Sequence, residues 1–363
     1  MNSTITPVQQ ARIQTSANRF KSYSFWLPIA GLFIFFIVPL LNPSYFIIDL
    51  AAKVLIFGIF AATFDVMLGY TGILSFGHSM FFGFGAYACA LFFKSMPDNP
   101  IMAIVLAFIS SALLSGLISL IMAFFSLRVV AMFFAMITLA FASFAEILAV
   151  QFSEITGGED GISIEIPNFF EVSYKIFGNL TGQTLLYYFI LIICGLMFFL
   201  MMRYTESPFG RVLKSIRENE DRSEALGYKT FHYRLFSIVF SCVLASFCGI
   251  LFALWLAYVN PESTLGIPIT INVLVMVLIG GMGTLYGGII GSFILHLLEG
   301  GLPQFRVLAD EVFPQYPILG QITGRWLLVS GLMFVLIVRF FPYGIIGWAK
   351  LRMAKRQLEQ FQK

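Results

Sequence analysis

The first candidates for chemistry in this 363-residue chain are three charged side chains that lie within long apolar runs. Lys53 and Asp65 share one run and Glu146 lies in another. A charge within hydrocarbon is costly, so each such residue is a functional candidate by default. Lys53 and Asp65 lie 12 positions apart, about 18 Å along a helix, so they cannot pair directly. These charges are too sparse for a proton relay, and we keep Asp65 and Glu146 as candidate intramembrane charges. End-capping or a loop contact is the alternative role for Asp65.

Sequence motifs of nucleotide-binding and hydrolytic proteins do not occur in this chain. There is no GxxxxGK[ST], HExxH or GxSxG pattern. The three histidines are scattered without metal-ligand spacing, and the four cysteines lie singly within apolar runs. We therefore predict no catalytic residue, no metal site, and no cofactor bound by this chain.

The glycine-rich stretch 69–87, GYTGILSFGHSMFFGFGAY, is the stronger candidate for binding. Glycine lets helices approach closely and frees backbone polar groups to face a ligand. A few hydroxyl and imidazole groups among phenylalanines would suit a small apolar solute with a polar head, and tight helix packing is the alternative. With the similar glycines near 280, the candidate pathway residues are Gly69, Gly72, Ser75, Phe76, His78, Ser79, Gly280, Gly281 and Gly283.

The elements that would position these residues are membrane-spanning helices. The chain is 59% hydrophobic and 11% charged, with a mean hydropathy of +0.88, whereas a soluble domain carries about 25% charged residues. We predict an all-α polytopic integral membrane protein. Its apolar segments fall at about 25–41, 47–68, 73–93, 101–125, 129–150, 184–202, 235–258, 268–281, 285–298 and 326–341.

The distribution of Lys and Arg predicts the topology. Basic residues concentrate before residue 25, in 203–234 and after residue 349, so all three regions should be cytoplasmic. An even number of spans must then follow residue 234, which requires 268–298 to break at GGMGTLYGG. Each piece would be about 21 Å long, shorter than the ~30 Å hydrocarbon core, as in discontinuous helices that line a pathway. One long kinked helix, giving nine spans, is the alternative.

Two glycine-interrupted regions with the same orientation indicate a parallel internal repeat. The glycines that compare are Gly69, Gly72 and Gly77 with Gly280, Gly283 and Gly287.

The charged segment 203–234 holds seven of the 22 Lys and Arg and five of the 19 Asp and Glu. Within it, an apolar stripe at i, i+3, i+4 and i+7 predicts a short amphipathic helix. Ser207 is the expected N-cap, Pro208 suits the first turn, and Gly227 suits the stop. Such a helix in an internal loop offers a surface to a soluble partner, and a solvated loop that fixes topology is the alternative.

These patterns divide the chain into three parts. Residues 1–24 form a cytoplasmic tail, residues 25–348 the transmembrane domain, and residues 349–363 a basic cytoplasmic tail. The domain includes the cytoplasmic loop 203–234 and the acidic external loop 151–183.

Five motifs in order carry a resemblance to a known family. They are the stretch at 69–87, TGGEDGI at 156–162, SPFGRVLKSIRENEDRSEALGY at 207–228, VLIGGMGTLYGGIIGS at 277–292 and FPYGIIGW at 341–348. Together they resemble the membrane subunits of bacterial ABC importers for branched-chain amino acids, of the M type of the Liv system. The resemblance covers about residues 25–348.

The resemblance implies the rest of an importer. It implies a homologous second permease subunit, two cytoplasmic ABC ATPase subunits that hold the ATP, and a periplasmic or extracellular solute-binding protein, with no nucleic acid. The chain would be a transport subunit in the bacterial inner membrane, not an enzyme, among membrane lipid and with both termini cytoplasmic. Residues 224–227, EALG, match the family's signature for the helix that seats in an ATPase groove. The expected ATPase-coupling residues are Phe209, Gly210, Arg211, Val212, Leu213, Ile216, Glu224, Ala225 and Gly227.

The function expected from these observations is import of leucine, isoleucine or valine, with ATPase motion coupled to alternating access. A permease for urea or short amides in the same superfamily is the nearest alternative. An ion-coupled secondary transporter would need carboxylates near mid-membrane. A channel or scaffold would use the glycines for packing alone.

Overall fold

The computed structural model describes residues 31–41, 44–129, 131–170, 175–177, 180–312, 326–340, 344–348 and 352. The predicted tails 1–24 and 349–363 lie outside these residues, apart from Arg352. The chain divides into two compact units, residues 1–51 and 52–363. The described part of the first unit holds a short apolar helix, Gly31–Leu41, and the first turns of α2 (Tyr45–Asp65).

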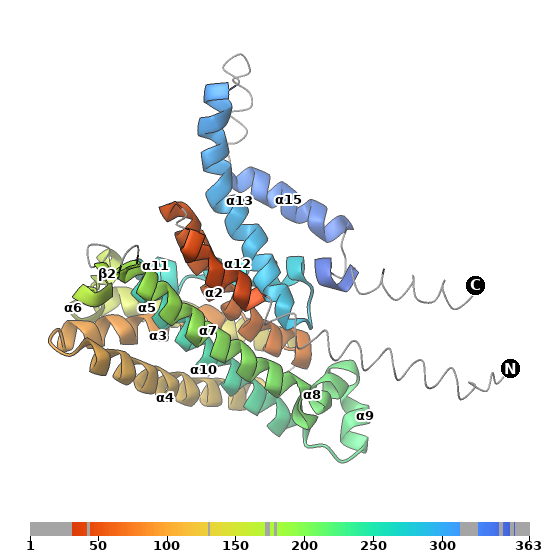
Figure 1. Ribbon diagram of the computed structural model, residues 1–363. Helices are drawn as coiled ribbons and strands as arrows, with labels where there is room; N and C mark the ends of the chain where they lie inside the picture. The colour runs from red at the N-terminus through yellow and green to blue at the C-terminus, as the bar shows by residue number, and fades with distance from the viewer. Residues whose placement is uncertain are drawn as a thin grey trace. The chain divides into compact units, whose positions relative to one another are not determined.

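The second unit is built mainly from long helices (Figure 1). After α2 and its π-helical turn η2 (Val66–Tyr70), the long helices are α3 (His78–Ser95), α4 (Pro100–Ser126), α5 (Ala131–Gln151), α7 (Gly182–Glu206), α10 (Thr230–Leu256), α12 (Ile267–Gly280), α13 (Leu285–Val312) and α15 (Trp326–Phe340). The shorter helices are α6 (Ser153–Thr156), η3 (Gly158–Asp160), η4 (Asn168–Phe170), α8 (Pro208–Glu218), α9 (Glu220–Ala225) and α11 (Pro261–Thr264). In the described part of the chain, two antiparallel strand pairs join β1 (Ile162–Ser163) to β4 (Tyr258–Val259) and β2 (Lys175–Phe177) to β3 (Leu180–Thr181).

The helices confirm a polytopic all-α membrane protein. Each of the ten apolar segments in the sequence contains helical residues in the described part of the chain. Among the described residues, six helices are long and apolar enough to cross a membrane by length and composition: Tyr45–Tyr70, Pro100–Ser126, Met132–Gln151, Gly182–Glu206, Thr230–Leu256 and Pro261–Gly280. The sequence 268–298 is two helices, α12 and α13, separated by residues 281–284. The orientation of the helices in a membrane stays a prediction.

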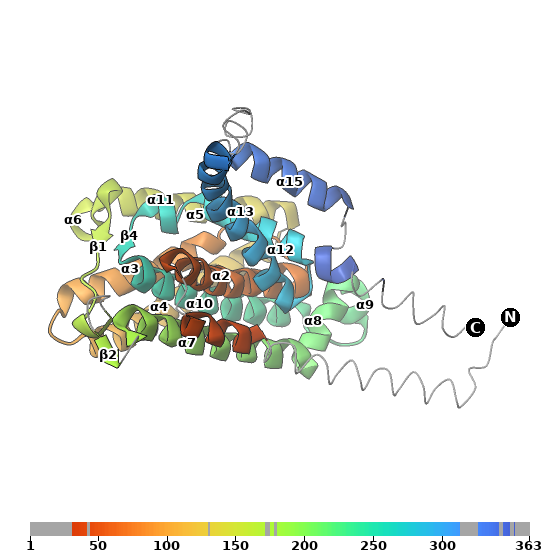
Figure 2. The same cartoon turned by 45° about the horizontal axis from the view of Figure 1, so that its top comes forward.

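The core of the second unit forms where α10 packs against α3 and α4, as both views show (Figure 1, Figure 2). Glycines allow the closest approach. A Cβ atom at Gly85 would overlap the carbonyl oxygen of Ser246, and one at Gly249 would overlap that of Phe82. Cys89, Cys194, Cys242 and Cys248 are free and buried, as expected of small apolar side chains.

The segments predicted as external loops contain regular structure. Residues 151–183 include α6, η3, η4 and strand residues, and their position outside the membrane stays a prediction. The helix expected to end near residue 298 continues to Val312, because Gly300 and Gly301 do not interrupt α13. Residues 313–325 lie outside the described part of the chain.

Candidate functional site

The charged segment after α7 forms two helices where one was predicted. Ser207 caps α8 as expected, since its hydroxyl accepts a hydrogen bond from the Gly210 N–H at 3.2 Å. The helix then breaks at Asn219, whose side chain accepts a bond from the Arg222 N–H at 2.9 Å and caps α9. An asparagine side chain can accept a hydrogen bond from a backbone N–H that follows it, which favours the start of a new helix over continuation of the old one. Gly227, at φ +90°, follows the end of α9.

The apolar stripe of α8 faces the rest of the protein. Leu213 and Ile216 are buried, at 0% and 1% exposure. The Phe209 ring lies 5.2 Å from that of Tyr204 and 4.7 Å from that of Tyr233, measured between centroids. These contacts fix α8 against the ends of α7 and α10.

The expected ATPase-coupling residues therefore divide into two groups. Gly210, Leu213 and Ile216 are buried, and Phe209 and Val212 are half-buried, so these five anchor α8 in this chain. Arg211, Glu224, Ala225 and Gly227 are exposed and remain open to a partner. The Glu224 carboxylate also accepts a hydrogen bond of 2.6 Å from the Thr230 hydroxyl, which ties α9 to the start of α10.

Asp65 makes the loop contact that was its alternative role. Its carboxylate is fully buried and accepts a hydrogen bond of 2.8 Å from the Gly283 N–H. Gly283 lies in the link between α12 and α13 at φ +78°, a conformation that favours glycine. The two glycine-interrupted regions thus meet, because a Cβ atom at Gly69 would overlap the Asp65 carboxylate and the Gly283 nitrogen.

The backbone between η2 and α3 is held by two threonines that the sequence reasoning missed. The Phe76 N–H donates to the Thr138 hydroxyl of α5 at 3.0 Å, and the Phe76 carbonyl accepts from the Thr270 hydroxyl of α12 at 3.3 Å. The Ser79 N–H donates to the same Thr270 hydroxyl at 3.1 Å. Unwound backbone in a membrane needs internal partners of this kind. The signal in the sequence for Thr138 and Thr270 is a hydroxyl group within an otherwise apolar helix.

The other polar pathway candidates are buried and bonded within the chain. The His78 ring stacks on Phe60 with centroids 5.2 Å apart, and its Nε2 lies 3.0 Å from the Thr63 hydroxyl. The Ser79 hydroxyl donates to the Leu265 carbonyl at 2.9 Å. Ser75 accepts a bond from the Gly77 N–H at 3.2 Å. Contact of these residues with a solute stays a prediction.

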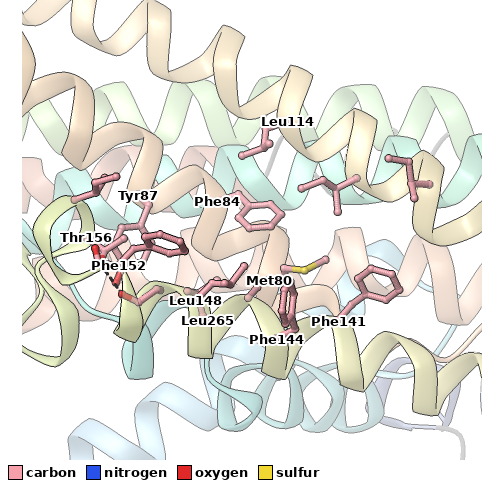
Figure 3. A pocket seen from close by; sticks show the side chains of 15 residues that line it. Met80, Phe84, Tyr87, Leu114, Phe141, Phe144, Leu148, Phe152, Thr156 and Leu265 are labelled. Carbon is pink, nitrogen blue, oxygen red and sulfur yellow. Dashed lines mark hydrogen bonds between the residues drawn. The ribbon is translucent and has the colours of Figure 1, made fainter.

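An apolar cavity of about 500 Å³ opens between α4 and α5 over a floor of α3 (Figure 3). The α3 side chains Met80, Phe84 and Tyr87 line it, and they belong to the glycine-rich stretch 69–87. None of the nine candidate pathway residues lines it. Glu146 on α5 is half-buried, and its carboxylate experiences the like charge of Glu262 on α11.

The TGGEDGI segment forms a tight, acidic turn after α5. Its glycines at 157, 158 and 161 all have positive φ. The Tyr258 hydroxyl donates to the Asp160 carbonyl at 2.7 Å, and β1 pairs with β4, so the turn is fixed to the end of α10. Glu159 and Asp160 remain exposed.

Comparison with known proteins decides which family this architecture belongs to. The model of the family described as the permease component of the branched-chain amino acid transport system matches residues 46–338. The chain belongs to this family. The match takes in both glycine-interrupted regions and the α8–α9 segment.

The permease protein LivM of the high-affinity branched-chain amino acid transport system of Escherichia coli is 29% identical, over 82% of this chain and 69% of the relative. Its counterpart in Salmonella typhimurium is 30% identical over the same shares. A probable LivM protein of Methanocaldococcus jannaschii is 23% identical, over 82% of this chain and 94% of the relative. No solved structure matches this chain.

Proposed function

We propose that this family member imports leucine, isoleucine or valine with energy from ATP that partner subunits hydrolyse. The observation that carries the proposal is the placement of α8. Its apolar side is fixed on α7 and α10, while Arg211 and the residues around Glu224 stay exposed. A charged helix held firmly to the spans and open on its other side is suited to receive mechanical work from a soluble subunit.

The proposed partners follow from the same reading. They are a second, homologous permease, two cytoplasmic ABC ATPases that bind the ATP, and an external solute-binding protein. The proposed location is the inner membrane with both termini cytoplasmic, among membrane lipid. The halves would rock about a midplane passage to give alternating access.

The burial of Asp65 argues against the alternative of an ion-coupled secondary transporter. An ion-coupled secondary transporter needs carboxylates free to bind an ion near mid-membrane. Asp65 is instead buried and bonded to the Gly283 backbone, which favours a structural use of its charge. The alternative of a permease for urea or short amides needs a test with both solutes.

Uptake in a strain that lacks this chain tests the proposed substrate. Restoring the chain should restore uptake of radiolabelled leucine, which unlabelled isoleucine and valine should inhibit, while urea uptake should not change. The physical reason is that the predicted passage, with phenylalanines around few polar groups, would suit a branched apolar body better than a small polar amide. Restored urea uptake with unchanged leucine uptake would contradict the proposal.

We predict that the acidic turn contacts the binding protein. Asp160→Lys should lower binding-protein-dependent leucine uptake about tenfold, because charges at an interface rim govern the association rate. The effect should weaken in high salt. Asp98→Lys is the matched control, since Asp98 is an exposed carboxylate in the link between α3 and α4, predicted to lie on the same face. Equal uptake by the two variants would count against the contact.

A further inference from the structure

The cytoplasmic helix α8 reaches directly into the meeting point of the two glycine-interrupted regions. We call Asp65, Gly69, Gly72, Arg217 and Gly283 the glycine junction. The Arg217 guanidinium donates a hydrogen bond to the Gly69 carbonyl, 148 positions away in the sequence. Lys214 precedes Arg217 by about one turn of α8, and its ammonium lies 5.0 Å from the centroid of the Tyr70 ring. Two cationic side chains of α8 therefore hold η2.

Two glycines make the room that Arg217 occupies. A Cβ atom at Gly72 would lie 3.2 Å from the Arg217 Cγ, and one at Gly283 would lie 3.1 Å from its Nη1. Both glycines have positive φ, at +74° and +78°. A side chain at either position would crowd the arginine and strain the backbone. The space around Arg217 is thus specified by the backbone of two separate regions.

Asp65 joins the second region to the first. One carboxylate oxygen accepts the Gly283 N–H, and the other makes no hydrogen bond among the described residues. The positive charge of Arg217 acts on this buried carboxylate. A buried carboxylate is costly unless it is paired or hydrogen-bonded, so Arg217 and the Gly283 N–H together offset that cost. Displacing Arg217 changes the environment of the α12–α13 link as well as that of η2.

The backbone at the junction is suited to bend. A π-helical turn departs from the regular hydrogen-bond ladder, and such turns frequently occur at functional positions. Residues 281–284 separate α12 from α13 and include two glycines at positive φ. Hinges are a few residues at element ends that absorb changes in φ and ψ.

We propose that Arg217 carries the displacement of α8 into both interrupted helix pairs, through the Gly69 carbonyl and through Asp65 to Gly283. Arg217 is a positioning residue in this scheme and touches no solute. The inference rests on the proposed function, since α8 must be moved by a partner. When α8 moves, η2 and the α12–α13 link move together, so the two regions open and close as one.

The test uses the complete importer reconstituted in proteoliposomes: this chain, its second permease, the ATPases and the binding protein. Arg217→Gln removes the charge, and Asp65→Asn keeps the acceptor for Gly283 while removing the carboxylate charge. Arg128→Gln is the matched control. Arg128 is also exposed and stacks on a ring, that of Phe124 at 4.4 Å, and it is predicted to lie on the same membrane face. ATP hydrolysis, leucine uptake and complex stoichiometry are measured together.

We expect the Arg217→Gln and Asp65→Asn importers to assemble and to hydrolyse ATP at the basal rate. Leucine transported per ATP, and stimulation of the ATPase by the binding protein, should fall about tenfold or more, in the range of coupling between distant sites. Arg217→Lys should recover part of the ratio. The Arg128→Gln importer should match the wild type.

Two results would overturn the inference. One is an unchanged ratio of leucine to ATP in both variants, and the other is a loss of uptake that only parallels loss of assembled complex. Failure of the wild-type importer to use ATP at all would instead reject the proposed function, so the two failures are distinguishable.

Discussion

Replacing Gly85 by alanine should destabilise the protein strongly, whereas replacing Gly116 by alanine should not. At Gly85 the new Cβ would overlap the Ser246 carbonyl, where α3 crosses α10. Overpacking of this kind costs about 3 kcal/mol. At Gly116, also within a helix, the new Cβ would meet only the Val243 side chain at 3.8 Å, an ordinary contact. There alanine should maintain stability or raise it by about 1 kcal/mol.

Thermal unfolding in detergent, followed by the loss of the monodisperse peak, measures the pair of variants. The same pair can be compared by the amount of protein that accumulates in the membrane. Equal melting temperatures for the Gly85 and Gly116 variants would mean that α3 and α10 do not cross at this glycine contact.

The Phe209→Asp variant should lose leucine uptake almost completely. The Phe209 ring contacts Tyr204 and Tyr233, and such aromatic contacts contribute about 1 kcal/mol each beyond burial. A carboxylate in place of the half-buried ring would be partly desolvated between two aromatic side chains, a cost that adds to the lost contacts. We expect α8 to detach from α7 and α10 and uptake to fall below about a tenth of the wild-type rate.

Phe209→Leu is the matched control because it keeps an apolar side chain at the same position. It should retain most of the uptake. Gly227→Pro should behave like Phe209→Asp, since proline cannot adopt φ +90° and would remove the Gly227 N–H that donates to the Glu224 carbonyl at 2.8 Å. Normal binding-protein stimulation of the ATPase in Phe209→Asp would show that α8 has no coupling role.

Much of the helix order follows from the sequence because apolar runs and glycine breaks are local signals. The break at 281–284 was predictable, since the basic regions require an even number of spans after residue 234 and the run at the break is rich in glycine. The cap at Ser207 and the inward side of α8 were predictable from spacing alone. The fold class needed nothing beyond composition and periodicity.

The interactions between regions were not predictable, because nothing local encodes them. Asp65 and Gly283 are 218 positions apart, and Arg217 and Gly69 are 148 apart. The charge of Asp65 pointed to a role but did not identify its partner. The helix start at Asn219 does have a local signal, since an asparagine followed by acidic residues is typical of a helix N-terminus. The π-helical turn at Val66–Tyr70 has no sequence signal that we recognise.

The position of α8 gives these observations a common meaning. One helix is anchored by Leu213 and Ile216, exposed at Arg211, and linked by Arg217 to both interrupted regions. A segment with only a structural role would need the anchoring by Leu213 and Ile216 alone. All three together suit an element that receives force on one side and delivers it on the other.

The central claim is tested most directly by leucine transport into vesicles that contain the reconstituted importer. The ATPase subunits face the vesicle interior, and transport is compared with and without ATP inside. We predict accumulation of leucine against its gradient that requires both ATP and the ATPase subunits, and that stops when hydrolysis is blocked. Accumulation by this chain alone, driven by an ion gradient and indifferent to ATP, would contradict the account.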